Sequence, residues 1–99
     1  MSRSHPGVEA DIRSAWLWYG ERSQQAARNF EAEVRAAFAI VKEGPDRWPK
    51  GSLGVRRYKL KRFPYSIVYL NDEQGLYFLA VAHGYRGPGF WMPRLREKR

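Results

Sequence analysis

Two segments in the N-terminal half of the chain repeat their apolar residues with the period of an α-helix. In the first segment the apolar positions are Val8, Ile12, Ala15, Trp16 and Tyr19. In the second they are Ala27, Phe30, Val34, Ala37, Phe38 and Val41. Pro6 suits a first helical turn and Gly20 ends the first segment. Ser23 is a good N-cap for the second segment, and Gly44, which precedes a proline, is a stop signal. The pattern predicts an antiparallel helical hairpin over about residues 6–43.

Beyond residue 54 the period changes from that of a helix to that of a strand. In the stretch RRYKLKRFPYSIVY, residues 56–69, the cations Arg57, Lys59 and Lys61 alternate with Tyr58 and Leu60. Because successive side chains of a strand point to opposite faces, one face carries charge and the other carries core residues. We therefore expect a cationic row on a face of the sheet that is open to solvent.

Two further strands follow this basic stretch. Residues 65–70 form the first of them, after the break at Pro64, and residues 76–83 form the second. The intervening turn, NDEQG, makes them an antiparallel hairpin. The predicted fold is a single α+β domain, residues 1–99, with the N-terminal helical hairpin packed on a small twisted antiparallel sheet over about residues 55–83. A basic segment, residues 84–99, completes the chain.

Composition narrows the class of protein. The chain has no cysteine and no apolar run near the roughly 20 residues that span a bilayer. The N-terminal sequence MSRSHPG lacks the apolar segment of a secretory signal, so we expect a cytoplasmic protein with no membrane partner. Neither a cluster with metal-ligand spacing nor a phosphate-cradling glycine loop is present, and no metal or organic cofactor is expected.

The net charge of +8 is distributed unevenly. Residues 1–49 are neutral, and the whole excess lies in residues 50–99. This asymmetry indicates a polyanionic partner, either nucleic acid or an acidic protein. The alternative for the basic cluster that includes Arg56, Arg57 and Arg62 is a solvated sheet face. Lysines two residues apart on a strand lie about 6–7 Å apart, close to the spacing of successive phosphates, which favours a binding surface.

Other polar and aromatic residues allow a functional and a structural interpretation. His83 ends the third strand and is either a proton carrier or a hydrogen-bonded structural residue. Tyr85 either stacks on a nucleic-acid base or caps the sheet. Asp11 is interpreted as a favourable charge near a helix N-terminus. By their helical spacing, Trp16 and Trp18 are expected to pack in the core or within the hairpin.

Several of these stretches together resemble the RelE/ParE superfamily of type II toxin–antitoxin toxins, in particular the branch of plasmid stabilisation proteins. The resemblance is carried by HPGVEADIRSAWLWY, AARNFEAEV, the loop motif PDRWP, RRYKLKRFPYSIVY and AVAHGYRGPGFW, in that order, and covers roughly residues 5–95. It implies two helices against a twisted antiparallel sheet. Family members also place a short edge strand before the first helix, and MSRS leaves little room for it, so we expect this strand to be stunted or absent.

The resemblance implies a growth-inhibiting toxin with one of two mechanisms. RelE-like members cleave mRNA in the ribosome without a metal. On that model Lys59 and Lys61 match the paired catalytic lysines, His83 carries a proton, and Arg86 stabilises the phosphorane charge. Arg56, Arg57, Arg62 and Tyr85 are then the candidate nucleic-acid-binding residues.

ParE-like members instead inhibit DNA gyrase and are not nucleases. Two positions depart from the nuclease pattern: Ser66 stands where ribonucleases have an arginine, and Phe90 and Trp91 stand where many have a tyrosine. The sequence favours ribosome-dependent mRNA cleavage, with gyrase inhibition as the alternative and a nucleic-acid-binding domain that merely shares the fold as a third interpretation. Either toxin implies a cognate antitoxin, with which the chain forms a possible hetero-oligomer.

Overall fold

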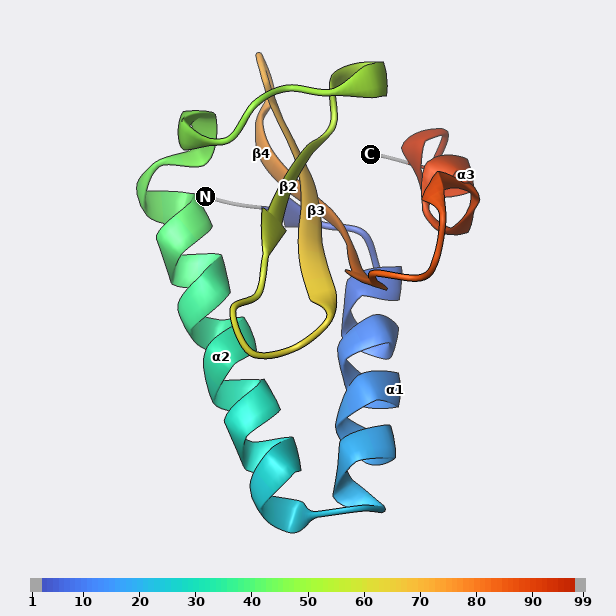
Figure 1. Ribbon diagram of the computed structural model, residues 1–99. Helices are drawn as coiled ribbons and strands as arrows, with labels where there is room; N and C mark the ends of the chain where they lie inside the picture. The colour runs from blue at the N-terminus through green and yellow to red at the C-terminus, as the bar shows by residue number, and fades with distance from the viewer. Residues whose placement is uncertain (1–2, 98–99) are drawn as a thin grey trace.

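The computed structural model describes residues 3–97 and arranges them as two helices, a four-stranded sheet and a short C-terminal helix (Figure 1). The α-helices and β-strands in chain order are β1 (Arg3–Ser4), α1 (Gly7–Gly20), α2 (Gln24–Glu43), β2 (Arg56–Lys59), β3 (Tyr65–Asp72), β4 (Gly75–His83) and α3 (Met92–Leu95). Three short 3-10 helices lie in the loops, at Pro45–Arg47, Ser52–Gly54 and Pro88–Phe90. Within residues 3–97, no helix has the length and apolar character needed to cross a membrane. The last two residues of the predicted basic segment, 98–99, lie outside the described residues.

The helical hairpin forms where the apolar pattern predicted it. Helix α1 begins directly after Pro6 and ends at Gly20. Helix α2 is capped by Ser23, whose hydroxyl accepts a hydrogen bond from the backbone N–H of Ala26 at 3.1 Å. It ends at Glu43, with Gly44 as its C-cap, as the glycine–proline step indicated. Figure 1 shows α1 and α2 as two arms that join at the tip and diverge toward the sheet.

The sheet has the strand order β1-β4-β3-β2. The three strands β2, β3 and β4 are antiparallel, as predicted. The stunted edge strand is present as β1, and it runs parallel to β4, with Arg3 opposite Tyr77 and Ser4 opposite Phe78. The sheet is therefore mixed, which corrects the prediction of a wholly antiparallel one. The short connection from β1 into α1 leads the chain directly onto one face of the sheet.

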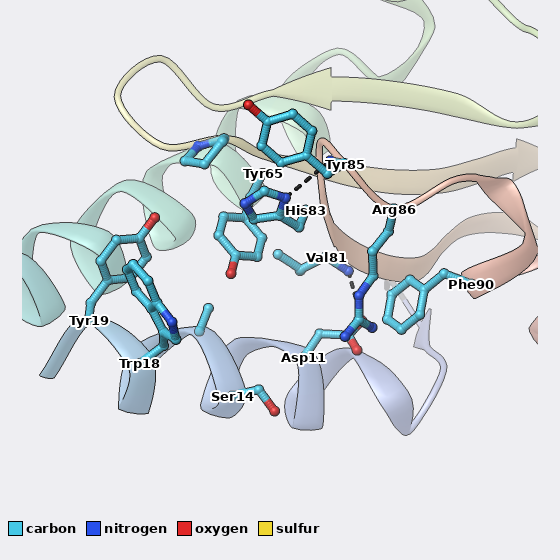
Figure 2. A pocket seen from close by; sticks show the side chains of 12 residues that line it. Asp11, Ser14, Trp18, Tyr19, Tyr65, Val81, His83, Tyr85, Arg86 and Phe90 are labelled. Atoms are coloured by element: carbon cyan, nitrogen blue, oxygen red, sulfur yellow. Dashed lines mark hydrogen bonds between the residues drawn. The ribbon is translucent and has the colours of Figure 1, made fainter. Parts of the chain in front are cut away.

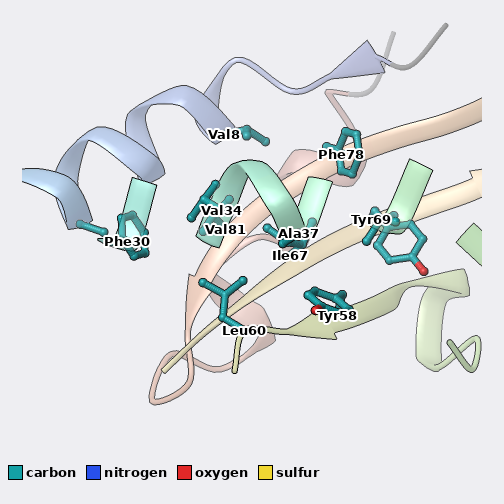
Figure 3. Close-up of a cluster of buried hydrophobic side chains, with 12 residues drawn as sticks. Val8, Phe30, Val34, Ala37, Tyr58, Leu60, Ile67, Tyr69, Phe78 and Val81 are labelled. Carbon is teal, nitrogen blue, oxygen red and sulfur yellow. The ribbon is translucent and has the colours of Figure 1, made fainter. Parts of the chain in front are cut away.

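The main core lies between the two helices and one face of the sheet, here called the helix face (Figure 3). Its most deeply buried side chains include Phe30, Val41, Ile67 and Tyr69. The helical period of α2 and the two-residue period of the strands direct these apolar side chains toward each other. Tyr58 and Leu60 point into the same core, as their alternation with cations predicted.

The opposite face of the sheet, here called the C-terminal face, carries a second core. Its members are Val55, Val68, Leu70, Tyr77, Leu79, Ala80, Ala82 and Trp91. Trp91 comes from the segment after β4 and is only 3% exposed, and Phe90 packs against the same cluster, so this aromatic pair folds back onto the domain. The expectation of a face open to solvent is thus wrong over much of the sheet. The strands β3 and β4 are apolar on both sides because both of their faces are covered.

The tryptophans of α1 are another correction. Trp16 is 41% exposed and Trp18 is 50% exposed, and Leu17 between them is 52% exposed. The buried residues of this helix are Val8 and Ala15. Trp16 directly follows Ala15 and is rotated by about 100° from it, which takes part of its ring out of the packed stripe. Periodicity predicted the helix correctly, but it did not show how narrow its buried stripe is.

The tyrosines of the two cores predict a loss of stability in alkali. Burial raises the pKa of Tyr19, Tyr65, Tyr69 and Tyr77 above the ordinary value of 10.0. The folded chain therefore holds these protons more tightly than the unfolded chain does. The contribution of these tyrosines to the free energy of unfolding is fully present below about pH 10. It is lost as the pH rises through the folded-state pKa values, by up to about 1.4 kcal/mol per pH unit for each tyrosine.

Urea unfolding at several pH values between about 8 and 11 measures this loss directly. In Tyr69→Phe the slope of the free energy of unfolding against pH should be shallower, because one of the titrating groups is gone. An unfolding free energy that does not change above about pH 10 would contradict the expectation.

Candidate functional site

A cavity of about 630 Å³ opens between α1 and the turn that follows β4 (Figure 2). It is lined by Asp11, Ser14, Ala15, Trp18, Tyr19, Pro64, Tyr65, Val81, His83, Tyr85, Arg86 and Phe90. Helix α1 supplies one wall, and the ends of β3 and β4 with their adjoining turns supply the other. The cavity contains His83, Tyr85 and Arg86, three of the residues singled out from the sequence.

The turn after β4 is held by backbone and side-chain hydrogen bonds. The N–H of Gly84 donates to the carbonyl of Pro64 at 2.7 Å, which fastens the turn to the start of β3. The N–H of Arg86 donates to the carbonyl of His83 at 3.0 Å. His83 Nδ1 accepts from the N–H of Tyr85 at 3.1 Å, which assigns its proton to Nε2 in the neutral ring. The His83 side chain is therefore oriented by its own turn.

Aromatic rings follow one another along the cavity wall. The ring centroids of Tyr19 and Tyr65 are 6.4 Å apart, and those of Tyr65 and His83 are 5.0 Å apart, both edge to face. The rings of His83 and Tyr85 are stacked, with centroids 5.1 Å apart and planes at 29°. Tyr85, the last ring, is 94% exposed. The series runs from the buried core to an open aromatic surface.

Arg86 supplies the positive charge on this wall of the cavity. Its guanidinium lies over the ring of Phe90 at 4.3 Å, a cation–π contact. Burial raises the pKa of the Tyr65 hydroxyl, and the positive charge of Arg86 acts in the opposite direction. The cavity thus combines stacked rings with a nearby exposed cation.

Asp11, which lines the cavity, forms a buried ion pair with Arg94 that the sequence did not predict. Arg94 NH1 and NH2 donate to the two carboxylate oxygens of Asp11 at 2.8 and 2.9 Å. The same carboxylate accepts from the N–H of Val81 at 3.0 Å, and the two side chains are only 6% and 14% exposed. The hydrogen bond to Asp11 raises the pKa of Arg94. A Cβ at Gly7 would lie 2.5 Å from Arg94 Cζ, so the glycine leaves room for this pair.

Asp11 therefore acts as an anchor between α1, β4 and the C-terminal segment, and the interpretation as a helix-terminus charge is corrected. A signal for this role was present in the sequence. Asp11 lies three residues after Val8 and four before Ala15, which places it on the buried stripe of α1. A carboxylate on such a stripe requires a partner.

The predicted catalytic residues do not all meet at the cavity. Lys59 pairs with Ser66, and Ser66 pairs with Ala82, so these three share one face of the sheet. Ala82 belongs to the C-terminal core, which identifies that face. His83 pairs with Tyr65, which packs against the helix-face core. Lys59 and His83 are therefore on opposite faces of the sheet, and only His83 and Arg86 of the four candidates line the cavity.

Lys61 and Arg62 lie beyond the end of β2, in the loop toward Pro64. The carboxylate of Glu33 on α2 accepts hydrogen bonds from the backbone N–H groups of both residues. Its other oxygen lies 3.3 Å from Arg62 Nε. The predicted cationic row is therefore short: Lys61 leaves the strand and turns toward α2 instead of continuing the line of Arg57 and Lys59.

The remaining two candidate arginines differ from each other. Arg56 donates from NH1 to the carbonyl of Trp48, and its NH2 lies 3.2 Å from the carboxylate of Asp46. This side chain is largely buried and fastens the loop before β2. Arg57 is exposed and lies over the ring of Trp91 at 5.7 Å, on the C-terminal face.

Comparison with known proteins identifies the family. A family model described as the ParE toxin of the type II toxin–antitoxin system parDE matches residues 3–88. Toxin ParE2 of two Mycobacterium tuberculosis strains is 28% identical over 87 residues, which cover 87% of this chain and 83% of the relative.

A solved structure of the chromosomal ParDE toxin–antitoxin system from P. aeruginosa shares the fold, with a TM-score of 0.71. It is 15% identical, and the match covers 83% of this chain and 92% of that one. The family match spans both helices and the whole sheet. The chain belongs to the ParE toxin family of type II toxin–antitoxin systems.

Proposed function

We propose that this ParE-family toxin stops growth by binding DNA gyrase, without cutting RNA. The observation that supports the proposal best is the position of Lys59 and His83 on opposite faces of the sheet. General acid–base cleavage needs its groups within reach of one phosphate. The mRNA cleavage favoured by the sequence would require Lys59 to act on the same phosphate as His83, with the sheet between them.

The positions that depart from the nuclease pattern support the same proposal. Trp91 is buried in the C-terminal core, so it offers no group to a substrate. Ser66 also faces that core side and brings no positive charge. ParE-like members of the superfamily are the gyrase inhibitors, and the family model that matches this chain is that of the ParE toxin.

An inhibitor that works by binding needs a contact surface, and α1 offers one. Trp16 and Leu17 are consecutive large apolar residues of this helix, and each is about half exposed. Trp18 joins them, with the guanidinium of Arg22 3.6 Å above its ring. Exposed apolar groups of this size, bordered by charge, are typical of protein-binding surfaces. We assign this surface to the gyrase contact.

The test measures DNA supercoiling by purified gyrase and maps mRNA ends on programmed ribosomes, both with the same toxin preparation. We expect inhibition of gyrase and no new mRNA ends. Trp16→Ser with Leu17→Ser should weaken gyrase inhibition by at least about tenfold, because two apolar contacts are lost. Leu53→Ser is the matched control, since Leu53 is also exposed but lies in the loop before β2.

Specific mRNA cleavage that disappears in His83→Gln, with supercoiling unaffected, would replace this proposal by the ribonuclease. Equal gyrase inhibition by the double variant and wild type would leave gyrase as the target but remove α1 as the contact surface. In cells, the order in which DNA and protein synthesis stop after induction gives the same distinction independently.

A further inference from the structure

We propose that the cavity beside α1 binds an unpaired nucleotide of a single-stranded nucleic acid. The base stacks on the ring of Tyr85, and Arg86 contacts the adjoining phosphate. The proposal goes beyond gyrase inhibition, because it assigns a second ligand to the cavity, whose lining shares only Trp18 with the proposed gyrase contact. It requires neither gyrase nor cleavage, so each can fail without the other.

The arrangement of the aromatic rings favours a ligand that contains a planar ring. Tyr85 is 94% exposed, yet its ring is oriented, because it stacks on His83 and His83 is held by Tyr65 and by the Tyr85 N–H. An exposed ring gains little from folding, since almost none of its surface leaves water. Figure 2 shows the rings of Tyr65, His83 and Tyr85 together at one side of the cavity. A nucleotide base offers the flat surface that extends such a stack.

The charges of the residues that line the cavity favour an anionic ligand. Asp11 is the one acidic residue among those that line the cavity, and Arg94 pairs with both of its oxygens. Arg86 therefore meets an incoming ligand without a competing carboxylate among the lining residues. Arg86 is the one Lys or Arg side chain among the lining residues, and it is exposed. The free positive charge of the cavity therefore favours an anion.

Rings and charge together favour a nucleic acid over an acidic peptide. Every nucleotide joins a planar ring to a phosphate, so one residue of the ligand satisfies both Tyr85 and Arg86. A peptide does so only where its sequence places an aromatic residue beside a carboxylate. The base must be unpaired, because both faces of a base are covered in a stacked duplex. Stacking and phosphate contacts do not use the 2′-hydroxyl, so DNA and RNA should bind with similar affinity.

Fluorescence of oligonucleotides that contain one 2-aminopurine tests the proposal on the full chain without gyrase. Quenching of this base reports stacking, which a purely electrostatic contact does not produce. We expect quenching with single-stranded DNA and RNA, and much weaker binding of a duplex of the same length. Tyr85→Ala should reduce affinity for the single strand about fivefold to 150-fold, as expected for one lost stacking contact, whereas Tyr85→Phe should retain it.

The controls separate this site from general attraction to a polyanion. Lys59→Ala removes a cation from the opposite face and should leave the quenching unchanged. Arg86→Gln should weaken binding and make it less dependent on salt, because a phosphate contact is lost. Equal affinity for duplex and single strand, or unchanged quenching in Tyr85→Ala, would overturn the proposal. Binding of an acidic, tyrosine-containing peptide with no binding of oligonucleotides would assign the cavity to a protein ligand instead.

Discussion

Asp11→Ala should lower the free energy of unfolding by about 3–5 kcal/mol, one of the two largest effects expected from a single substitution in this chain. The variant leaves the Arg94 guanidinium in a site that is only 14% exposed, without the carboxylate that now binds it through two hydrogen bonds. The N–H of Val81 loses its acceptor as well. A buried charge without a partner costs more than the pair itself contributes, because its hydration is not recovered.

Urea unfolding followed by tryptophan fluorescence measures this loss. Glu9→Ala is the matched control, since Glu9 is exposed in the first turn of the same helix and should cost no more than about 1 kcal/mol. Combining Asp11→Ala with Arg94→Met should recover much of the stability, because an apolar side chain then replaces the unpaired charge. A loss below about 1 kcal/mol for Asp11→Ala alone would show that the ion pair is not needed.

The sequence predicted the architecture because each element has a strong local signal. The stripes of α1 and α2, the Ser23 cap and the alternation around Tyr58 all agree with the same two-layer packing. Such agreement between local pattern and tertiary structure is expected of a well-specified fold. Strand β1 had the weakest signal, since two residues are too few to display a period.

The site was harder to predict because it depends on which face of the sheet each strand residue occupies. Lys59 and His83 are 24 residues apart in the sequence, and nothing local fixes their relative faces. The register of β2 against β3, and of β3 against β4, decides it. A shift of one residue in either pairing would move a side chain to the other face.

Some of the positive charges stabilise the fold and are not available to a ligand, and composition alone does not distinguish the two roles. Arg56 and Arg94 contribute to the basic half of the chain, but both hold loops or helices in place through Asp46 and Asp11. Arg86 and Lys59 are exposed. Their availability to a ligand follows from burial and pairing, which only the three-dimensional arrangement shows.

Trp91→Ala is the other substitution with a large expected effect, a loss of about 3–5 kcal/mol. Trp91 is 3% exposed and joins the C-terminal segment to the side chains of β3 and β4 on the C-terminal face. Without its ring, Val68 and Ala82 would border a cavity or water. The backbone of Trp91 also accepts from the N–H of Arg94 at 2.9 Å, at the start of α3. We therefore expect the segment after β4 to detach before the helical hairpin unfolds.

Urea unfolding and limited proteolysis together test this expectation. Trp91→Phe should cost less than about 1.5 kcal/mol, because it keeps most of the ring and removes an indole N–H that has no acceptor within residues 3–97. Met92→Ala is the control on the adjacent residue, since Met92 is 41% exposed. Trp91→Ala should be cut rapidly after residue 84, while Trp91→Phe and Met92→Ala resist. If Trp91→Ala were as stable and as resistant as wild type, the Trp91 ring would contribute nothing to the stability of the C-terminal core.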